Sequence, residues 1–351
     1  MTPPAPSPRP RITVTGVIAA VLGAGLFVSA IQHAGLTSIL DGMRSVGWGF
    51  VLILGLSGLR TLCRAVAWTL CSEGPARLRL ADTFPAFLTG EALGNLTPLG
   101  LFVSEPTKAV FVRHRVSLMT AVSGLAIENL LYTLSVAVVI ASGTVAMLFS
   151  FDVPRAIRIF SVILLIGMLA LLAGSGWVLG RQVKMVSPML NWLHRRRWLP
   201  DSLSQRLEKL RHLEDSIYGF HRRHPQRMLS VLVLEAAYHV AGVAEVFVIL
   251  AWISHTPTLL VAFVFETMNR ATNVVFKFVP MRLGVDEAGS GLLSTALGYG
   301  SATGVTLAIV RKVRVLFWTA IGLLLLANRG LRATPSASVD PTEQEQPAPL
   351  R

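Results

Sequence analysis

The stretch that decides the fold runs from Gly90 to Lys108 and reads GEALGNLTPLGLFVSEPTK. It lies in apolar surroundings, yet it contains two glutamates, an asparagine, a lysine, two prolines and three glycines. Carboxylates and broken helical backbone are costly in hydrocarbon unless protein or a polar cavity surrounds them. The stretch therefore predicts a re-entrant hairpin over residues 84–112, with its turn between Asn95 and Gly100, in place of a plain membrane-spanning helix.

A second stretch repeats the pattern of the first. Residues 97–105 read TPLGLFVSE and residues 279–287 read VPMRLGVDE, with Pro, Leu, Val and Glu at the same four places. The offset is 280 − 98 = 182, and the triplet Leu-Ala-Ile at 125–127 recurs at 307–309 with the same offset. A diverged internal repeat is therefore favoured over chance, and it predicts a second hairpin over residues 258–298.

The composition is that of an integral membrane protein. The 351 residues are 52% hydrophobic and 15% charged, whereas soluble domains are about 25% charged. The net charge of +13 is explained by basic loops on the cytoplasmic side, so we expect no nucleic-acid partner. The two cysteines, Cys63 and Cys71, are about 12 Å apart along a helix, too far for a disulfide. No cluster of metal ligands is present in the sequence, and we expect no cofactor.

The hydrophobic segments and basic loops predict two inverted halves. The loop over residues 181–227 has eleven Lys or Arg against four acids and is expected in the cytoplasm. Three full spans and one hairpin in each half would invert the second half relative to the first. The expected divisions are a disordered basic tail over 1–11, a first membrane repeat over 12–149, a second, inverted repeat over 150–328 and a disordered tail over 329–351.

The predicted fold class is an all-α polytopic membrane protein. We expect an inverted-repeat helical bundle with about six full spans and two re-entrant hairpins that open to opposite sides. The first full span is expected over residues 12–31 and the last over 300–328. Both termini are expected in the cytoplasm, and the protein is expected in the cell (plasma or inner) membrane.

Charged and amide side chains at membrane depth are the candidate substrate-binding residues. Cations bind phosphate, and acids pair with the cations or receive an amine. One alternative is that these charges only pair to fix helix packing, and another is that arginines on residues 48–70 reach back to the cytoplasmic surface. The candidates are Arg60, Arg64, Glu91, Asn95, Glu105, Lys108, Glu128, Glu266, Arg270, Asn273, Lys277, Arg282, Asp286, Glu287 and Arg311.

Two short elements resemble those of a known family. TPLG at 97–100 with SEPTK at 104–108, and VP at 279–280 with GVDE at 284–287, are similar to the paired elements of the lysylphosphatidylglycerol synthase transmembrane-region family, also called flippase-like membrane proteins. Glu128 looks like the acidic residue of that family's following helix. The resemblance covers roughly residues 12–328. The sequence departs from the family's glycine-rich pattern at 102–104 and 281–283, which leaves the substrate open.

The resemblance implies lipid translocation, because only about twenty residues follow the last span and the soluble synthase domain is not expected. The predicted function is a lipid flippase or transporter that moves a polar-headed phospho- or glycolipid through a cavity between the two hairpins. The alternatives are an intramembrane lipid-modifying enzyme, with Glu91, Glu105 and His239 as acid–base candidates, and an accessory membrane protein of lipid or envelope biosynthesis. Against an enzyme, the sequence contains no G-x-S-x-G, H-E-x-x-H or Asp-rich motif. The expected partners are membrane lipids and possible lipid-synthesis enzymes, while the lipid, the direction, the energy source and the oligomeric state stay open.

The first hairpin can be tested by cysteine accessibility. We expect Arg79→Cys and Ser117→Cys, each in a chain with Cys63 and Cys71 replaced by alanine, to react with a membrane-impermeant thiol reagent from the cytoplasmic side only. Labelling is compared between spheroplasts and inside-out vesicles. Reaction of the two positions from opposite sides would show that residues 84–112 cross the membrane.

Overall fold

The computed structural model describes residues 37, 40–41, 44, 46–73, 77–97, 100–181, 219–220, 222–254, 257–276, 280–282 and 284–332. Within these ranges all regular structure is helical, which confirms the all-α class predicted from the sequence. The predicted span over 12–31, Lys277, most of the basic loop and both predicted tails, apart from residues 329–332, lie outside the described residues.

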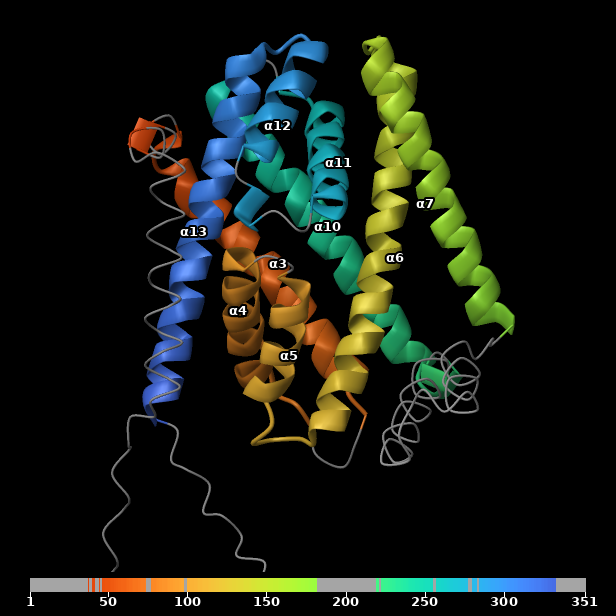
Figure 1. Ribbon diagram of the computed structural model, residues 1–351, viewed down its shortest axis with the longest axis vertical. Helices are drawn as coiled ribbons and strands as arrows, with labels where there is room; N and C mark the ends of the chain where they lie inside the picture. The colour runs from red at the N-terminus through yellow and green to blue at the C-terminus, as the bar shows by residue number, and fades with distance from the viewer. Residues whose placement is uncertain are drawn as a thin grey trace, which may run out of the picture.

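Five long helices form the body of the molecule (Figure 1). They are α3 (Gly49–Cys71), α6 (Leu118–Ser150), α7 (Arg155–Arg181), α10 (Pro225–Ile253) and α13 (Ser301–Arg332). In the described part of the chain, four helical segments are long and apolar enough to cross a membrane: Gly49–Cys71, Leu118–Ser150, Arg155–Val178 and Pro225–Ile253. The 32-residue α13 is long enough, but it carries three cations near its middle, Arg311, Lys312 and Arg314.

Two pairs of short helices lie at opposite ends of this body. The first pair is α4 (Leu80–Leu96) and α5 (Leu101–Phe111), and the second is α11 (Leu259–Val275) and α12 (Val285–Ala296). At 1.5 Å per residue, none of them reaches the roughly 30 Å of a hydrocarbon core. Figure 1 shows the first pair in the lower half of the view and the second pair in the upper half. Their insertion into a membrane as re-entrant hairpins stays a prediction.

The order of the helices repeats along the chain. Adding 182 to the bounds of α3, α4, α5 and α6 gives 231–253, 262–278, 283–293 and 300–332. The corresponding helices α10, α11, α12 and α13 occupy 225–253, 259–275, 285–296 and 301–332. The offset found between two nine-residue stretches therefore also relates four pairs of helices, while the exact division into two repeats stays a prediction.

Packing between the halves is centred on α3 and α10, which contact each other extensively. One core cluster joins Ile53 of α3 to Val246 and Ile249 of α10, and it continues to Phe265 of α11 and Leu307 of α13. Helix α7 packs against α6 at the edge of the molecule and exposes most of its apolar side chains. The central helices are thus held by apolar contacts on one side, and their other faces enclose polar groups.

Glycine allows α13 to approach both short pairs closely. A Cβ at Gly322 would lie 2.7 Å from the Cβ of Ala92 on α4 and would also meet the carbonyl oxygen of Leu88. A Cβ at Gly304 would lie 2.6 Å from the Cβ of Ser294 on α12. Small residues permit this kind of close backbone approach between membrane helices.

We expect Gly322→Leu to destabilise the protein by about 1–3 kcal/mol, because the added side chain overlaps the backbone of α4. Thermal unfolding in detergent, followed by tryptophan fluorescence, measures the change. Gly167→Leu is the matched control, since nothing lies within 4 Å of a Cβ at this exposed position on α7. Equal unfolding temperatures for the two variants would contradict the close contact between α13 and α4.

Candidate functional site

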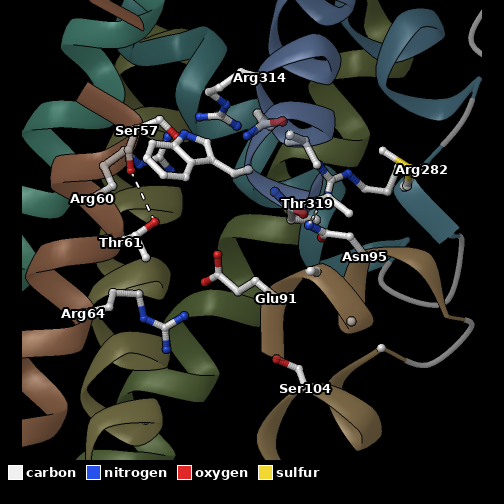
Figure 2. A pocket seen from close by; sticks show the side chains of 18 of the residues that line it. Ser57, Arg60, Thr61, Arg64, Glu91, Asn95, Ser104, Arg282, Arg314 and Thr319 are labelled. Atoms are coloured by element: carbon white, nitrogen blue, oxygen red, sulfur yellow. Dashed lines mark hydrogen bonds between the residues drawn. The ribbon is translucent and has the colours of Figure 1, made fainter. Parts of the chain in front are cut away.

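A polar cavity of about 490 Å³ lies where the two short pairs approach the long helices. Figure 2 shows Arg60 and Arg64 on α3 at one side, and Glu91 and Asn95 on α4 at the other. The carboxylate of Glu91 extends from α4 toward α3. Both short pairs and α3, α6, α10 and α13 contribute side chains to its wall.

Most of the residues predicted from the sequence are brought together here. The cavity is lined by eleven of them: Arg60, Arg64, Glu91, Asn95, Glu105, Lys108, Arg270, Asn273, Arg282, Asp286 and Arg311. Glu128, Glu266 and Glu287 do not line it, but each forms an ion pair with a cation that does. Lys277 lies outside the described residues.

The largest group of charges, which we call the Glu266 cluster, comprises Glu245, Glu266 and four arginines. Glu266 accepts from Arg270 Nε at 2.9 Å and Arg60 Nη2 at 3.4 Å, and it also pairs with Arg311. Glu245 accepts from Arg60 Nη1 at 2.9 Å and from Arg314 Nη1 at 2.5 and 2.6 Å. Four cations against two acids leave this cluster with a charge of 4 − 2 = +2.

A second group, the Arg64 cluster, comprises Arg64, Glu105, Lys108, Glu128 and Asn129. Arg64 forms a bidentate pair with Glu128 at 2.7 and 2.9 Å and also donates to the Asn129 amide oxygen at 3.1 Å. Glu105 accepts from Lys108 Nζ and from Asn129 Nδ2, both at 2.8 Å. Two cations against two acids make this cluster neutral, and the pair with Glu128 argues against Arg64 reaching back to the membrane surface.

The backbone between α11 and α12 holds a third group of charges. Arg282 pairs with Asp286, while Glu287 pairs with Lys312 and accepts from the backbone N–H of Gly284 at 2.9 Å. Met281 and Arg282 are both at φ 48°, in the left-handed region that non-glycine residues seldom adopt. Such strained backbone is concentrated at functional sites, where the surrounding structure maintains it.

The charges are arranged in two layers. Eight cations line the cavity, against the three acids Glu91, Glu105 and Asp286, a lining charge of 8 − 3 = +5. The four acids behind them, Glu128, Glu245, Glu266 and Glu287, reduce the sum to 8 − 7 = +1. The cations thus face the cavity, and three of their counterions, Glu128, Glu245 and Glu266, are buried behind them. An excess of cations along a cavity wall favours anions over cations there.

The acid–base candidates occupy different environments. Glu105 is held in an ion pair with Lys108, and His239 bonds to Ser135 and does not line the cavity. Glu91 lines the cavity, and among the described residues it forms no ion pair. In the same ranges, no group of three His, Cys, Asp or Glu could hold a metal ion.

Several lining residues were not among those predicted. Tyr132 and Tyr238 bond to each other and to Arg270, at 3.1 and 2.7 Å. The helical spacing on α6 could have indicated Tyr132, which lies one turn after Glu128 on the same face. Thr319 bonds to Asn95 at 3.4 Å across α13 and α4, a pairing that no local pattern indicates.

Fold and cavity together define a polytopic helical membrane protein with a charged internal site. Residues 16–322 match the family described as the lysylphosphatidylglycerol synthase TM region. This match covers most of the chain, so the protein belongs to that family, as the short motifs around Pro98 and Pro280 indicated. The chain matches no curated protein and no solved structure.

The buried pair of Arg64 and Glu128 can be tested by a double-mutant cycle. We expect Arg64→Met or Glu128→Leu alone to destabilise the protein by about 3–5 kcal/mol, because each leaves a buried charge without its partner. The double variant should lose less than either single variant, since no unpaired charge remains. Thermal unfolding in detergent measures all four proteins, and additive losses would contradict a direct pair.

Proposed function

We propose that this protein moves a lipid with a phosphate-bearing headgroup across the cell membrane, the headgroup passing through the charged cavity. The observation that carries the proposal is the layer of eight cations facing a cavity in a membrane protein, with acids behind them. Phosphate accepts charge-assisted hydrogen bonds from arginine and lysine. The acyl chains would remain in the bilayer, so their apolar surface would not be transferred to water.

Existing contacts of the arginines support reversible binding. Arg60 divides its guanidinium between Glu245, Glu266 and Tyr238, and the contacts with the last two are long, at 3.4 and 3.3 Å. A phosphate group can replace such weak bonds while the shorter ion pair is kept. A site that binds anions too tightly would retain the lipid, so transport requires cations that are already partly neutralised.

The repeated helix order supports alternating access. Two pairs of half-length helices enter from opposite ends of the bundle and both contribute to one cavity. Inverted repeats with broken helices around a central site are typical of secondary transporters. In this proposal both termini are cytoplasmic, the protein lies in the plasma or inner membrane, and the short pairs are re-entrant.

Transport is tested in proteoliposomes that contain acyl-labelled fluorescent phosphatidylglycerol and a membrane-impermeant reductant outside. We expect the purified protein to expose inner-leaflet lipid to the reductant. Arg282→Gln should slow this about tenfold to a hundredfold, the rate equivalent of losing a charge-assisted bond of about 1.5–3 kcal/mol. Arg158→Gln is the control, because Arg158 lies on α7 and pairs with the exposed Asp152.

Two results would contradict the proposal. One is protein-containing vesicles that protect the labelled lipid as well as empty vesicles do. The other is equal slowing by Arg282→Gln and Arg158→Gln, which would separate any activity from the cavity. Appearance of a chemically altered phospholipid in thin-layer analysis of the same vesicles would favour the enzyme alternative, with Glu91 as its free carboxylate.

A further inference from the structure

Three polar side chains lie together outside the cavity, where α6 meets α10. They are Ser135 of α6 and Glu235 and His239 of α10, and the proposed transport site uses none of them. Glu235 is 2% exposed and His239 is 7% exposed. A buried polar group in a membrane helix requires a physical reason, because it costs free energy unless it is paired.

Glu235 differs from the other buried acids of the described chain. Glu128, Glu245 and Glu266 each form an ion pair with at least one arginine. Glu235 has no ion pair among the described residues, and its Oε1 is buried without a hydrogen-bond partner there. An ionised carboxylate is very costly in such a place, whereas a neutral carboxylic acid is not.

The hydrogen bonds of Ser135 indicate the same state. Its hydroxyl has one proton and is 2.8 Å from the Tyr132 carbonyl, 3.2 Å from Glu235 Oε2 and 3.0 Å from His239 Nε2. A hydroxyl has one proton, so Ser135 cannot donate to the Tyr132 carbonyl and to Glu235 at the same time. When it donates over the shorter contact, to the carbonyl, a neutral carboxyl at Glu235 can donate to the serine oxygen. The contact with His239 Nε2 fits a proton on that nitrogen.

The charged groups around this trio are committed to other partners. Arg64 of α3 is bonded to Glu128, Arg270 of α11 to Glu266, and Arg314 of α13 to Glu245. The titratable groups that face it are Arg60, Cys63, Arg64 and Cys71 on α3, Glu128 on α6, Tyr238 on α10, and Glu266 and Arg270 on α11. None of them forms an ion pair with Glu235.

We propose that Ser135, Glu235 and His239 form a proton-binding site that is coupled to anion binding in the cavity. Two contacts make the connection: Ser135 bonds to the backbone of the cavity residue Tyr132, and the His239 ring lies edge-on to the cavity residue Tyr238, with centroids 5.2 Å apart. Loss of the proton to solvent would place a negative charge behind the cavity cations and weaken their attraction for an anion. By linkage, a bound anion strengthens proton binding to the same extent.

Infrared difference spectroscopy of the purified protein tests the protonation state independently of transport. We expect a carboxylic C=O stretching band at neutral pH in the wild type that is absent in Glu235→Gln. Asp152→Asn, at an exposed acid on α7, should retain the band. Ser135→Ala should retain it at higher frequency, because the carboxyl loses its hydrogen-bond acceptor, and this variant also serves if Glu235→Gln does not fold. No such band in the wild type, or no change of the band in either variant, would overturn the site.

The coupling rests on the proposed function and has its own test. A pH indicator in weakly buffered detergent should report proton uptake when phosphatidylglycerol is added at a pH where the band is partly lost. Phosphatidylcholine, which has no net charge, should cause less uptake, and Glu235→Gln should abolish it. Equal uptake by wild type and Glu235→Gln would overturn the coupling. If the carboxylic C=O band is present but the protein moves no lipid, the proton site stands and only the transport proposal is contradicted.

Discussion

One buried carboxylate, that of Glu266, joins three helices of the molecule. It is bound by Arg60 from α3, Arg270 from its own helix and Arg311 from α13. Each of these cations would be costly in a membrane interior without a counterion. The positions of α3, α11 and α13 are therefore linked, since separating α13 from Glu266 would leave Arg311 without its carboxylate, and separating α3 would leave Arg60 paired with Glu245 alone. A change of conformation must move these helices together or replace the lost partner, and an anion in the cavity is such a replacement.

The sequence predicted the helices better than it predicted their contacts. Hydrophobic spacing and the break at Pro98 and Gly100 indicated α4 and α5 as two short helices, because these are local properties of the chain. The offset of 182 then indicated α11 and α12 as a second pair of short helices. The partner of each charge could not be predicted, because Arg64 and Glu128 are 64 residues apart and Arg60 and Glu245 are 185 apart.

The prediction also did not separate the acids from the cations. All fifteen candidates were treated as one set, whereas Glu128, Glu266 and Glu287 lie behind the cavity and support its cations. Arg282, which with Met281 has left-handed backbone, bonds to Asp286, while Glu287 pairs with Lys312. That conformation is unusual for residues other than glycine, so a residue-type pattern does not reveal it.

The two charge clusters, each of which contains an arginine of α3, differ in net charge. The Arg64 cluster is neutral, whereas the Glu266 cluster carries +2, so an anionic headgroup has its lowest energy near the latter. In the proposed transport, this asymmetry would set where a headgroup rests and would not by itself set the direction of net movement. The direction would follow from the difference in lipid content between the two leaflets and from any ion that moves with the lipid. A proton held at Glu235 would be such an ion, because its charge acts on the cavity that holds the headgroup.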